Sequence, residues 1–184
     1  KIVATSREFL KKYKINVILE PLPSGAYYNP SRGFLDTHQM LLPLEEWAFV
    51  FFDNISVVYM RRIEAHRALI ASYEYKLLRR GISANYWAFP QKGVTDSNRS
   101  RAELEYERCL QFTPVNLYCL VGKASFLRSR NDFNGALEFL RTAERVHSLN
   151  PELILEFISL YEKMGDSASL RKMQRKLKKV LIEE

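Results

Sequence analysis

Apolar and small side chains recur at spacings of three and four residues from about residue 63 to residue 182, which is the period of an α-helix. Turn-forming residues interrupt this period at Asn131-Asp132 and Gly165-Asp166, where asparagine and glycine tolerate the left-handed backbone of a helix C-terminus. Asn150-Pro151 matches an N-cap followed by proline at the first helical position. We predict helices over residues 63–80, 99–112, 115–129, 133–148, 151–164 and 167–182.

The helical part also repeats itself, with a period of about 34 residues. A shift by this period places Leu120 on Ile154 and Asp132 on Asp166, and a small or apolar residue recurs in most aligned columns without a gap. The other aligned pairs are Ala124 with Ile158, Leu127 with Tyr161, Asn131 with Gly165, Ala136 with Leu170, Ala143 with Leu177, Ala102 with Ala136, Tyr106 with Leu140 and Cys109 with Ala143. Such a repeat predicts a stack of helix pairs, in which the small residues let neighbouring helices approach closely.

These columns resemble tetratricopeptide repeats (TPRs) over residues 63–184. The segment Ala102-x3-Tyr106-x2-Cys109-x4-Pro114 follows the pattern of the second helix of a repeat. The next two repeats match through Leu120, Ala124, Leu127, Ala136, Leu140, Ala143, Ile154, Phe157, Ile158, Tyr161, Gly165 and Leu170. The sequence departs from the pattern at Gln174 and Ser148, and the first helix pair matches only with about 16 residues inserted after Gly81.

The resemblance implies an α-solenoid of about three helix pairs, whose first helices form a concave groove for a protein or peptide partner. The groove-facing residues that the columns indicate are Tyr118, Ser125, Arg128, Glu152, Ser159 and Glu162. The insertion at residues 82–98 contains Tyr86, Trp87 and Phe89. Two interpretations of these aromatic residues stand: they seal the junction between the two parts of the chain, or they form a contact for a partner.

Residues 1–62 follow a different period. Phe9, Leu10 and Tyr13 lie on one face of a short predicted helix, and the apolar run over residues 15–19, ended by Pro21, predicts a buried strand. Together with the hairpin described below, this helix and strand form a unit that is too small to stand alone. It either packs on the first repeat helices or is the remainder of a larger α/β unit cut at Lys1.

A β-hairpin is predicted next, because two apolar runs over residues 47–52 and 55–59 flank Asp53-Asn54, a two-residue turn signal. Residues 21–43 hold four prolines and predict a long loop with one helical turn near residues 33–41. The predicted fold class is therefore mainly α with a small α/β part. The domains are a sheet-and-helix cap over residues 1–62 and a TPR-like solenoid over residues 63–184.

A second resemblance rests on the order helix, Lys12-Tyr13-Lys14-Ile15-Asn16-Val17-Ile18-Leu19, then Trp47-x2-Val50-Phe51-x-Asp53-x3-Val57-Val58-Tyr59-x-Arg61. This order is similar to the soluble C-terminal domain of bacterial polytopic membrane proteins related to family-39 and mannosyltransferase-type glycosyltransferases. In that family a Tyr-Gly-Val-Asp-Ala-Val-Leu-Leu strand precedes a hairpin that opens on tryptophan and closes on arginine. Lys14 stands for the glycine and Asn16 for the aspartate. The resemblance implies that the catalytic acids lie in membrane-proximal loops outside this chain, and some members of the family continue into TPRs.

Composition and charge limit the classes of protein to which this chain can belong. The 184 residues are 47% hydrophobic and 12% aromatic, which excludes disorder for most of the chain. The formal charge is +7, and its one concentrated run is Arg171, Lys172, Arg175, Lys176, Lys178 and Lys179. We interpret this run as the solvated face of an amphipathic helix whose apolar positions are Leu170, Met173, Leu177 and Leu181. The alternative is an anionic surface partner, and no signature of specific nucleic-acid binding is present.

The sequence predicts no catalytic residue, no cofactor and no metal site. His38, His66 and His147 have no second ligand at zinc spacing, and no glycine-rich phosphate loop or nucleophile elbow occurs. Cys109 falls on a core column, which favours a buried inert thiol. Cys109 and Cys119 are too few for a disulfide framework or a four-ligand zinc site.

The resulting hypothesis is a non-catalytic protein-interaction module: the soluble tail of a larger bacterial membrane protein on its extracytoplasmic face. It would reach the membrane by tethering through an upstream segment rather than by direct binding. One alternative is a free-standing cytoplasmic TPR scaffold or co-chaperone, but Glu152, Glu156 and Glu162 argue against the acidic peptide that a co-chaperone would bind. The other alternative is an accessory domain that shapes acceptor access to a membrane glycosyltransferase site.

Overall fold

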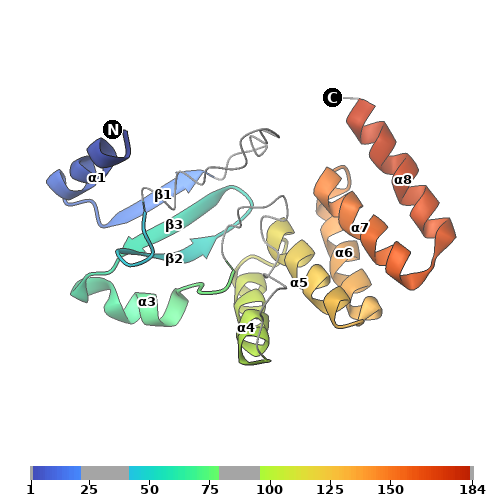
Figure 1. Cartoon of the computed structure of the whole chain (residues 1–184), viewed down its shortest axis with the longest axis horizontal. Helices are drawn as coiled ribbons and strands as arrows, with labels where there is room; N and C mark the ends of the chain where they lie inside the picture. The colour runs from blue at the N-terminus through green and yellow to red at the C-terminus, as the bar shows by residue number, and fades with distance from the viewer. Residues whose placement is uncertain (1, 22–41, 79–95, 183–184) are drawn as a thin grey trace. The chain divides into compact units, whose positions relative to one another are not determined.

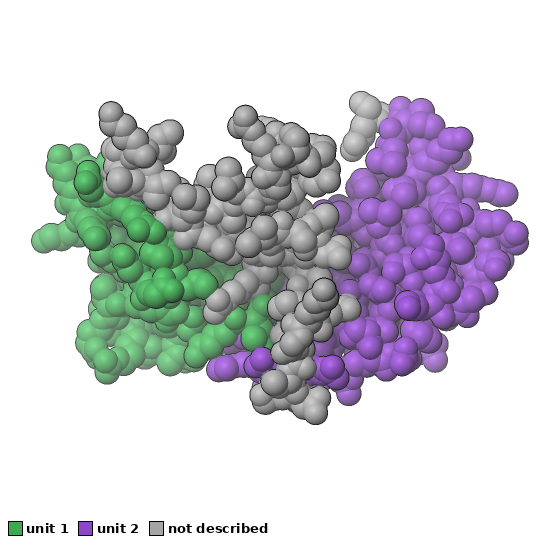
Figure 2. Space-filling view, in the orientation of Figure 1, with its two compact units in different colours: residues 1–86 green, residues 87–184 purple. Residues whose placement is uncertain are grey.

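The computed structural model describes residues 2–21, 42–78 and 96–182 (Figure 1). These residues are mainly α-helical and include a three-stranded antiparallel sheet, so the predicted fold class is confirmed at this level. The chain divides into two compact units, Lys1–Tyr86 (unit 1) and Trp87–Glu184 (unit 2), which Figure 2 colours separately. The division follows residue 86 rather than residue 62, the predicted boundary.

Unit 1 is built around the sheet. Helix α1 (Ile2–Lys12) precedes strand β1 (Val17–Pro21), and strands β2 (Trp47–Phe52) and β3 (Ser56–Arg61) form a hairpin. The strand order is β1-β3-β2, and both pairs are antiparallel. The predicted short helix, strand and hairpin are therefore confirmed as elements. The strand is not buried as predicted, because β1 lies at the edge of the sheet and its Val17 and Leu19 are 46% and 69% exposed. The helical turn predicted near residues 33–41 lies outside the described residues.

The hairpin turn is one residue longer than predicted. Asp53 Oδ1 accepts hydrogen bonds from the N–H groups of Ile55 (2.8 Å) and Ser56 (2.7 Å). This Asx-type turn uses residues 53–55 to connect the strands, because the aspartate side chain replaces a backbone acceptor. Ile55 consequently lies outside the strand, and its side chain is exposed.

Helix α3 (Arg67–Tyr73) follows a 3-10 turn at Glu64–His66 and packs on β2. Its Ile70 forms a core cluster with Ala48 and Val50 of β2. This buried contact with the sheet places α3 in unit 1.

The helix predicted over residues 63–80 ends at Tyr73 because Tyr75 bonds to and packs against the sheet instead of continuing the helix. The Tyr75 N–H donates to the Phe49 carbonyl oxygen at 2.8 Å, which draws the backbone out of the helix. The Tyr75 ring then packs against the rings of Phe49 (5.6 Å between centroids) and Phe52 (5.1 Å). A tertiary contact thus overrides the helical period of the sequence.

Lys14 connects α1 to β1 with a φ of 52°. The Ile15 N–H closes this helix end by donating to the Leu10 carbonyl oxygen at 3.0 Å, as in a Schellman motif. The left-handed region favours glycine, so Lys14 holds a backbone conformation that a lysine seldom adopts.

Unit 2 is a succession of five helices in the described residues: α4 (Asp96–Phe112), α5 (Leu117–Ser129), α6 (Phe133–His147), α7 (Pro151–Met164) and α8 (Ser167–Ile182). Each helix packs on the next, and α5 also packs on α7. Figure 1 shows their alternating directions. All five match the predicted helices to within three residues at each end. Within the described part of the chain, no helix combines the length and the apolar character needed to span a bilayer.

The helix ends of unit 2 recur at the period of the sequence repeat. Asn131 and Gly165 both adopt the left-handed conformation, with φ of 63° and 71°, as predicted. Asn150 is confirmed as an N-cap, because its side chain accepts from the Leu153 N–H at 2.9 Å. Asn116, which sequence reasoning did not single out, caps α5 in the same way by accepting from the Cys119 N–H at 3.1 Å.

The core of unit 2 contains the predicted columns. The four small residues expected to allow close helix approach, Ala102, Ala124, Ala136 and Ala143, are each at most 1% exposed. Tyr106, Leu120, Leu140, Ile154 and Phe157 are buried beside them.

Cys109 and Cys119 form a disulfide, with their Cα atoms 6.5 Å apart. The prediction of a free, inert thiol at Cys109 is therefore wrong, although its burial is confirmed at 1% exposure. The repeat column located Cys109 correctly on α4. It did not show that the short connection to α5 returns Cys119 to the same place in the core.

Candidate functional site

The predicted groove residues lie on α5 and α7, two helices that pack on each other. Tyr118, Ser125 and Arg128 follow one another along one side of α5, and Glu152, Ser159 and Glu162 do so along α7. Ser125 is buried, Glu162 is exposed and the other four are half-buried. We call these six residues, together with Glu156, the first-helix face.

Arg128 joins the two helices of this face. Its Nη2 lies 3.1 Å from Glu156 Oε2 on α7 and 3.2 Å from Ser125 Oγ on its own helix. The Arg128 and Glu156 side chains are only 18% and 16% exposed, and Arg128 Nε is a buried donor that has no hydrogen-bond partner among the described residues. The structure thus brings Ser125 and Arg128 together with Glu156 into one half-buried polar cluster.

Burial controls the acidity of two carboxyl groups on the first-helix face. Burial raises the pKa of Glu156, and the nearby Arg128 guanidinium opposes that rise. Burial also raises the pKa of Glu152, which lies in the first turn of α7. Among the described residues no cationic side chain forms an ion pair with Glu152 or Glu162. Arg128, the one cation of the first-helix face, is paired with Glu156.

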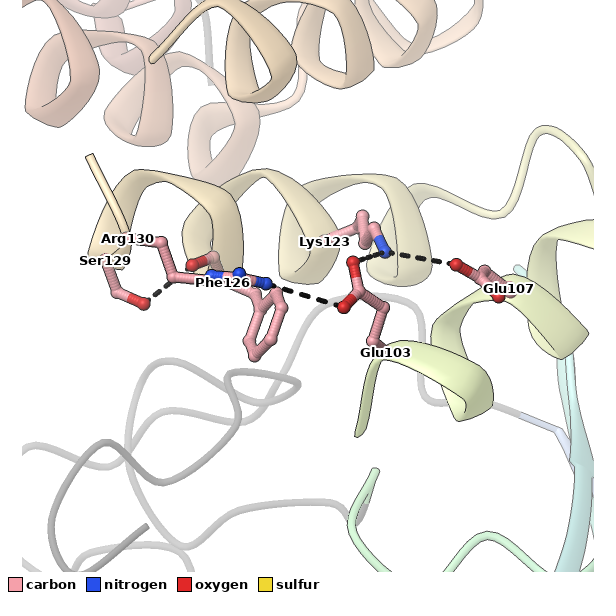
Figure 3. Close-up of polar contacts among 6 residues, drawn as sticks. All are labelled: Glu103, Glu107, Lys123, Phe126, Ser129 and Arg130. Atoms are coloured by element: carbon pink, nitrogen blue, oxygen red, sulfur yellow. Dashed lines mark hydrogen bonds and ion pairs between the residues drawn. The ribbon is translucent and has the colours of Figure 1, made fainter. Parts of the chain in front are cut away.

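A second polar cluster joins α4 to α5 (Figure 3). Lys123, whose side chain is 6% exposed, places Nζ 2.9 Å from Glu103 Oε1 and 3.8 Å from Glu107 Oε1. Arg130 Nη1 reaches the other Glu103 oxygen at 3.5 Å, and both cations lie over the Phe126 ring. Because Lys123 is buried and paired, we assign this cluster to packing between helices. Sequence reasoning missed it, although Lys123 aligns with the core residue Phe157 in the repeat.

The other residues considered for chemistry are dispersed. His66 Nδ1 lies 3.0 Å from the Arg61 carbonyl oxygen, and His147 Nε2 lies 3.4 Å from that of Val115. In the part of the chain that the structure describes, no three His, Cys, Asp or Glu side chains gather as a metal site would require. His38 and the aromatic residues Tyr86, Trp87 and Phe89 lie outside the described residues.

Neither a scan against protein-family models nor comparisons with curated proteins and with solved structures finds a match to this chain.

Proposed function

We propose that unit 2 is a TPR-like interaction module that binds a protein or peptide through its first-helix face. The observation that carries the proposal is the recurrence of one helix-pair geometry at the period of the sequence repeat, in the N-caps Asn116 and Asn150 and in the left-handed Asn131 and Gly165. The packing of α5 on α7 supports it further, because adjacent first helices are what a shared binding face requires.

The charge of the first-helix face favours a basic ligand segment. Arg128 is paired with Glu156, so Glu152 and Glu162 leave a negative balance on a chain whose net charge is +7. A lysine or arginine of a ligand would compensate the partly desolvated Glu152 carboxylate, whereas an acidic peptide would be repelled. This charge balance argues against the co-chaperone alternative.

We further propose that the module is the tail of a bacterial membrane protein and faces the extracytoplasmic side. Lys14 supports the resemblance of residues 1–62 to the glycosyltransferase-associated domain, because its φ of 52° suits the glycine of that family. The Cys109–Cys119 disulfide supports an oxidising compartment. A free-standing cytoplasmic scaffold would instead keep both cysteines reduced.

A displayed library of random peptides tests the ligand proposal. The full-length chain should enrich peptides containing lysine or arginine, and the double variant Glu152→Gln, Glu162→Gln should lose that enrichment. Glu138→Gln is the matched control, because Glu138 is an exposed glutamate on α6, outside the first-helix face. Enrichment of acidic peptides, or equal loss in the control, would contradict the proposal.

A further inference from the structure

Six apolar side chains are exposed at the ends of helices and in the connections of unit 2. Two of them belong to the junction of α4 with α5, two occupy the equivalent positions of the next repeat at the junction of α6 with α7, and two end α8. Their exposed fractions range from 45% at Val115 to 70% at Ile182. We call them the apolar ridge: Phe112, Val115, Val146, Leu149, Leu181 and Ile182.

Contacts between helices bring the parts of the ridge to one end of unit 2. His147 Nε2 at the end of α6 lies 3.4 Å from the Val115 carbonyl oxygen, which joins the two junctions. Lys176 of α8 pairs with Glu144 of α6 within the last two turns of each helix. Figure 1 shows that α8 ends on the same side of the unit as the connection between α6 and α7.

Packing of α8 on its neighbours does not account for the apolar residues at its end. Met173 is buried, and Leu177 and Val180 are partly buried. Leu181, which the sequence analysis placed on the packed stripe, is 58% exposed, and that interpretation is wrong. Val180 takes the inward position because it continues the spacing of three from Leu177, and Leu181 is turned outward with Ile182.

Cations border the ridge. Lys178 and Lys179 lie three and two residues before Leu181, and Arg145 comes directly before Val146; all three are exposed. Helix α8 contains no acidic residue from Ser167 to Ile182, and Glu183 and Glu184 follow it in the sequence. We call Arg145, Lys178 and Lys179 the basic rim.

We propose that the apolar ridge and its basic rim form a docking surface for an anionic bilayer. Apolar side chains that protrude among lysines suit an interface where hydrocarbon lies just below charged headgroups. The docking adds a direct contact to the proposed tethering, and it does not depend on the peptide-binding function of the first-helix face.

Co-sedimentation of the full-length chain with vesicles tests the proposal. With vesicles of equal parts phosphatidylglycerol and phosphatidylcholine, the chain should pellet at low salt and less at about 0.15 M salt, and it should bind phosphatidylcholine alone far more weakly. The double variant Leu149→Ser, Ile182→Ser should bind at least roughly tenfold more weakly. Lys178→Gln and Lys179→Gln should each weaken binding about fivefold.

Matched controls separate the ridge from general surface effects. Leu104 is 64% exposed, close to the 65% of Leu149, but lies about two turns before the end of α4, so Leu104→Ser should bind like the wild type. Lys172→Gln, near the start of α8, should also bind like the wild type. Absence of pelleting, or equal losses in the controls, would overturn the proposal. So would loss of self-association, measured by ultracentrifugation without vesicles, in the Leu149→Ser, Ile182→Ser variant, because the ridge would then be a protein interface.

Discussion

The ion pair between Arg128 and Glu156 offers a quantitative test of how α5 and α7 pack. Its N···O distance is 3.1 Å, and its side chains are 18% and 16% exposed, so it lies between a surface pair and a buried one. Surface pairs contribute up to about 1 kcal/mol, whereas breaking a fully buried pair costs roughly 3–5 kcal/mol. We therefore expect Arg128→Met to lower the free energy of unfolding by about 2 kcal/mol.

A double-mutant cycle isolates the pair itself. Glu156→Gln alone should cost about 1 kcal/mol, and the double variant should cost less than the sum, with a coupling energy on the order of 1–1.5 kcal/mol. Urea unfolding followed by far-UV circular dichroism measures each variant. The exposed pair of Arg67 and Glu64, at 3.0 Å with side chains 77% and 78% exposed, is the control and should couple by less than about 0.5 kcal/mol. Additive effects for Arg128 and Glu156 would refute the inferred contact between the two helices.

The pH dependence of the stability of the Arg128→Met variant tests the same ion pair, because it should change in one direction only. Burial raises the pKa of Glu156, and Arg128 opposes that rise, so removing Arg128 should raise the pKa further. A carboxyl group whose pKa is higher in the folded state binds more protons there, so stability falls as pH rises through that range. The cost of Arg128→Met should thus be largest near about pH 7 and shrink as the pH approaches about 4. A cost that grows on acidification would contradict the assignment.

Three further predictions concern the framework of unit 2. Ala136→Trp should lower the free energy of unfolding by about 3 kcal/mol or unfold the chain, because Ala136 is 1% exposed, whereas Trp at the exposed Glu138 should be nearly neutral in a thermal melt. Asn116→Ala and Asn150→Ala should each lower the free energy of unfolding in urea by about 1 kcal/mol, because each removes an N-cap. A change near zero for either variant would show that its asparagine does not stabilise the helix as an N-cap. Replacing both Cys109 and Cys119 by alanine should lower the free energy of unfolding by about 3 kcal/mol, the value for so short a loop. The denatured, unreduced wild type should show no titratable thiol, and two titrated thiols would contradict the disulfide.

The helix ends of unit 2 could be predicted from the sequence because each depends on a few adjacent residues. Asn131, Gly165 and Asn150 are identified by residue type and position alone, since the left-handed conformation and the N-cap select asparagine and glycine. The sequence repeat adds a second copy of each feature, so one correct assignment supports another. Local rules and the repeat agree in unit 2, and all five of its predicted helices are present within three residues.

The remaining features depend on contacts that no local pattern encodes. Helix α3 ends early because the Phe49 carbonyl oxygen, far back in the chain, accepts from the Tyr75 N–H. Cys119 meets Cys109 through the geometry of the connection between α4 and α5. On the first-helix face, the columns identified Ser125 and Arg128, but the pairing of Arg128 with Glu156 follows from the distance between α5 and α7.

Unit 2 has an acidic surface and a basic surface, which lie on different helices. The side of α5 and α7 holds Glu152 and Glu162, whereas the end and outer side of α8 hold exposed Lys178 and Lys179 without an intervening acid. A basic ligand drawn to the first face would be repelled by the basic rim, and an anionic bilayer would be repelled by the first face. Salt screens both repulsions, so the two proposed binding events should oppose each other most strongly at low salt and less at about 0.1 M salt.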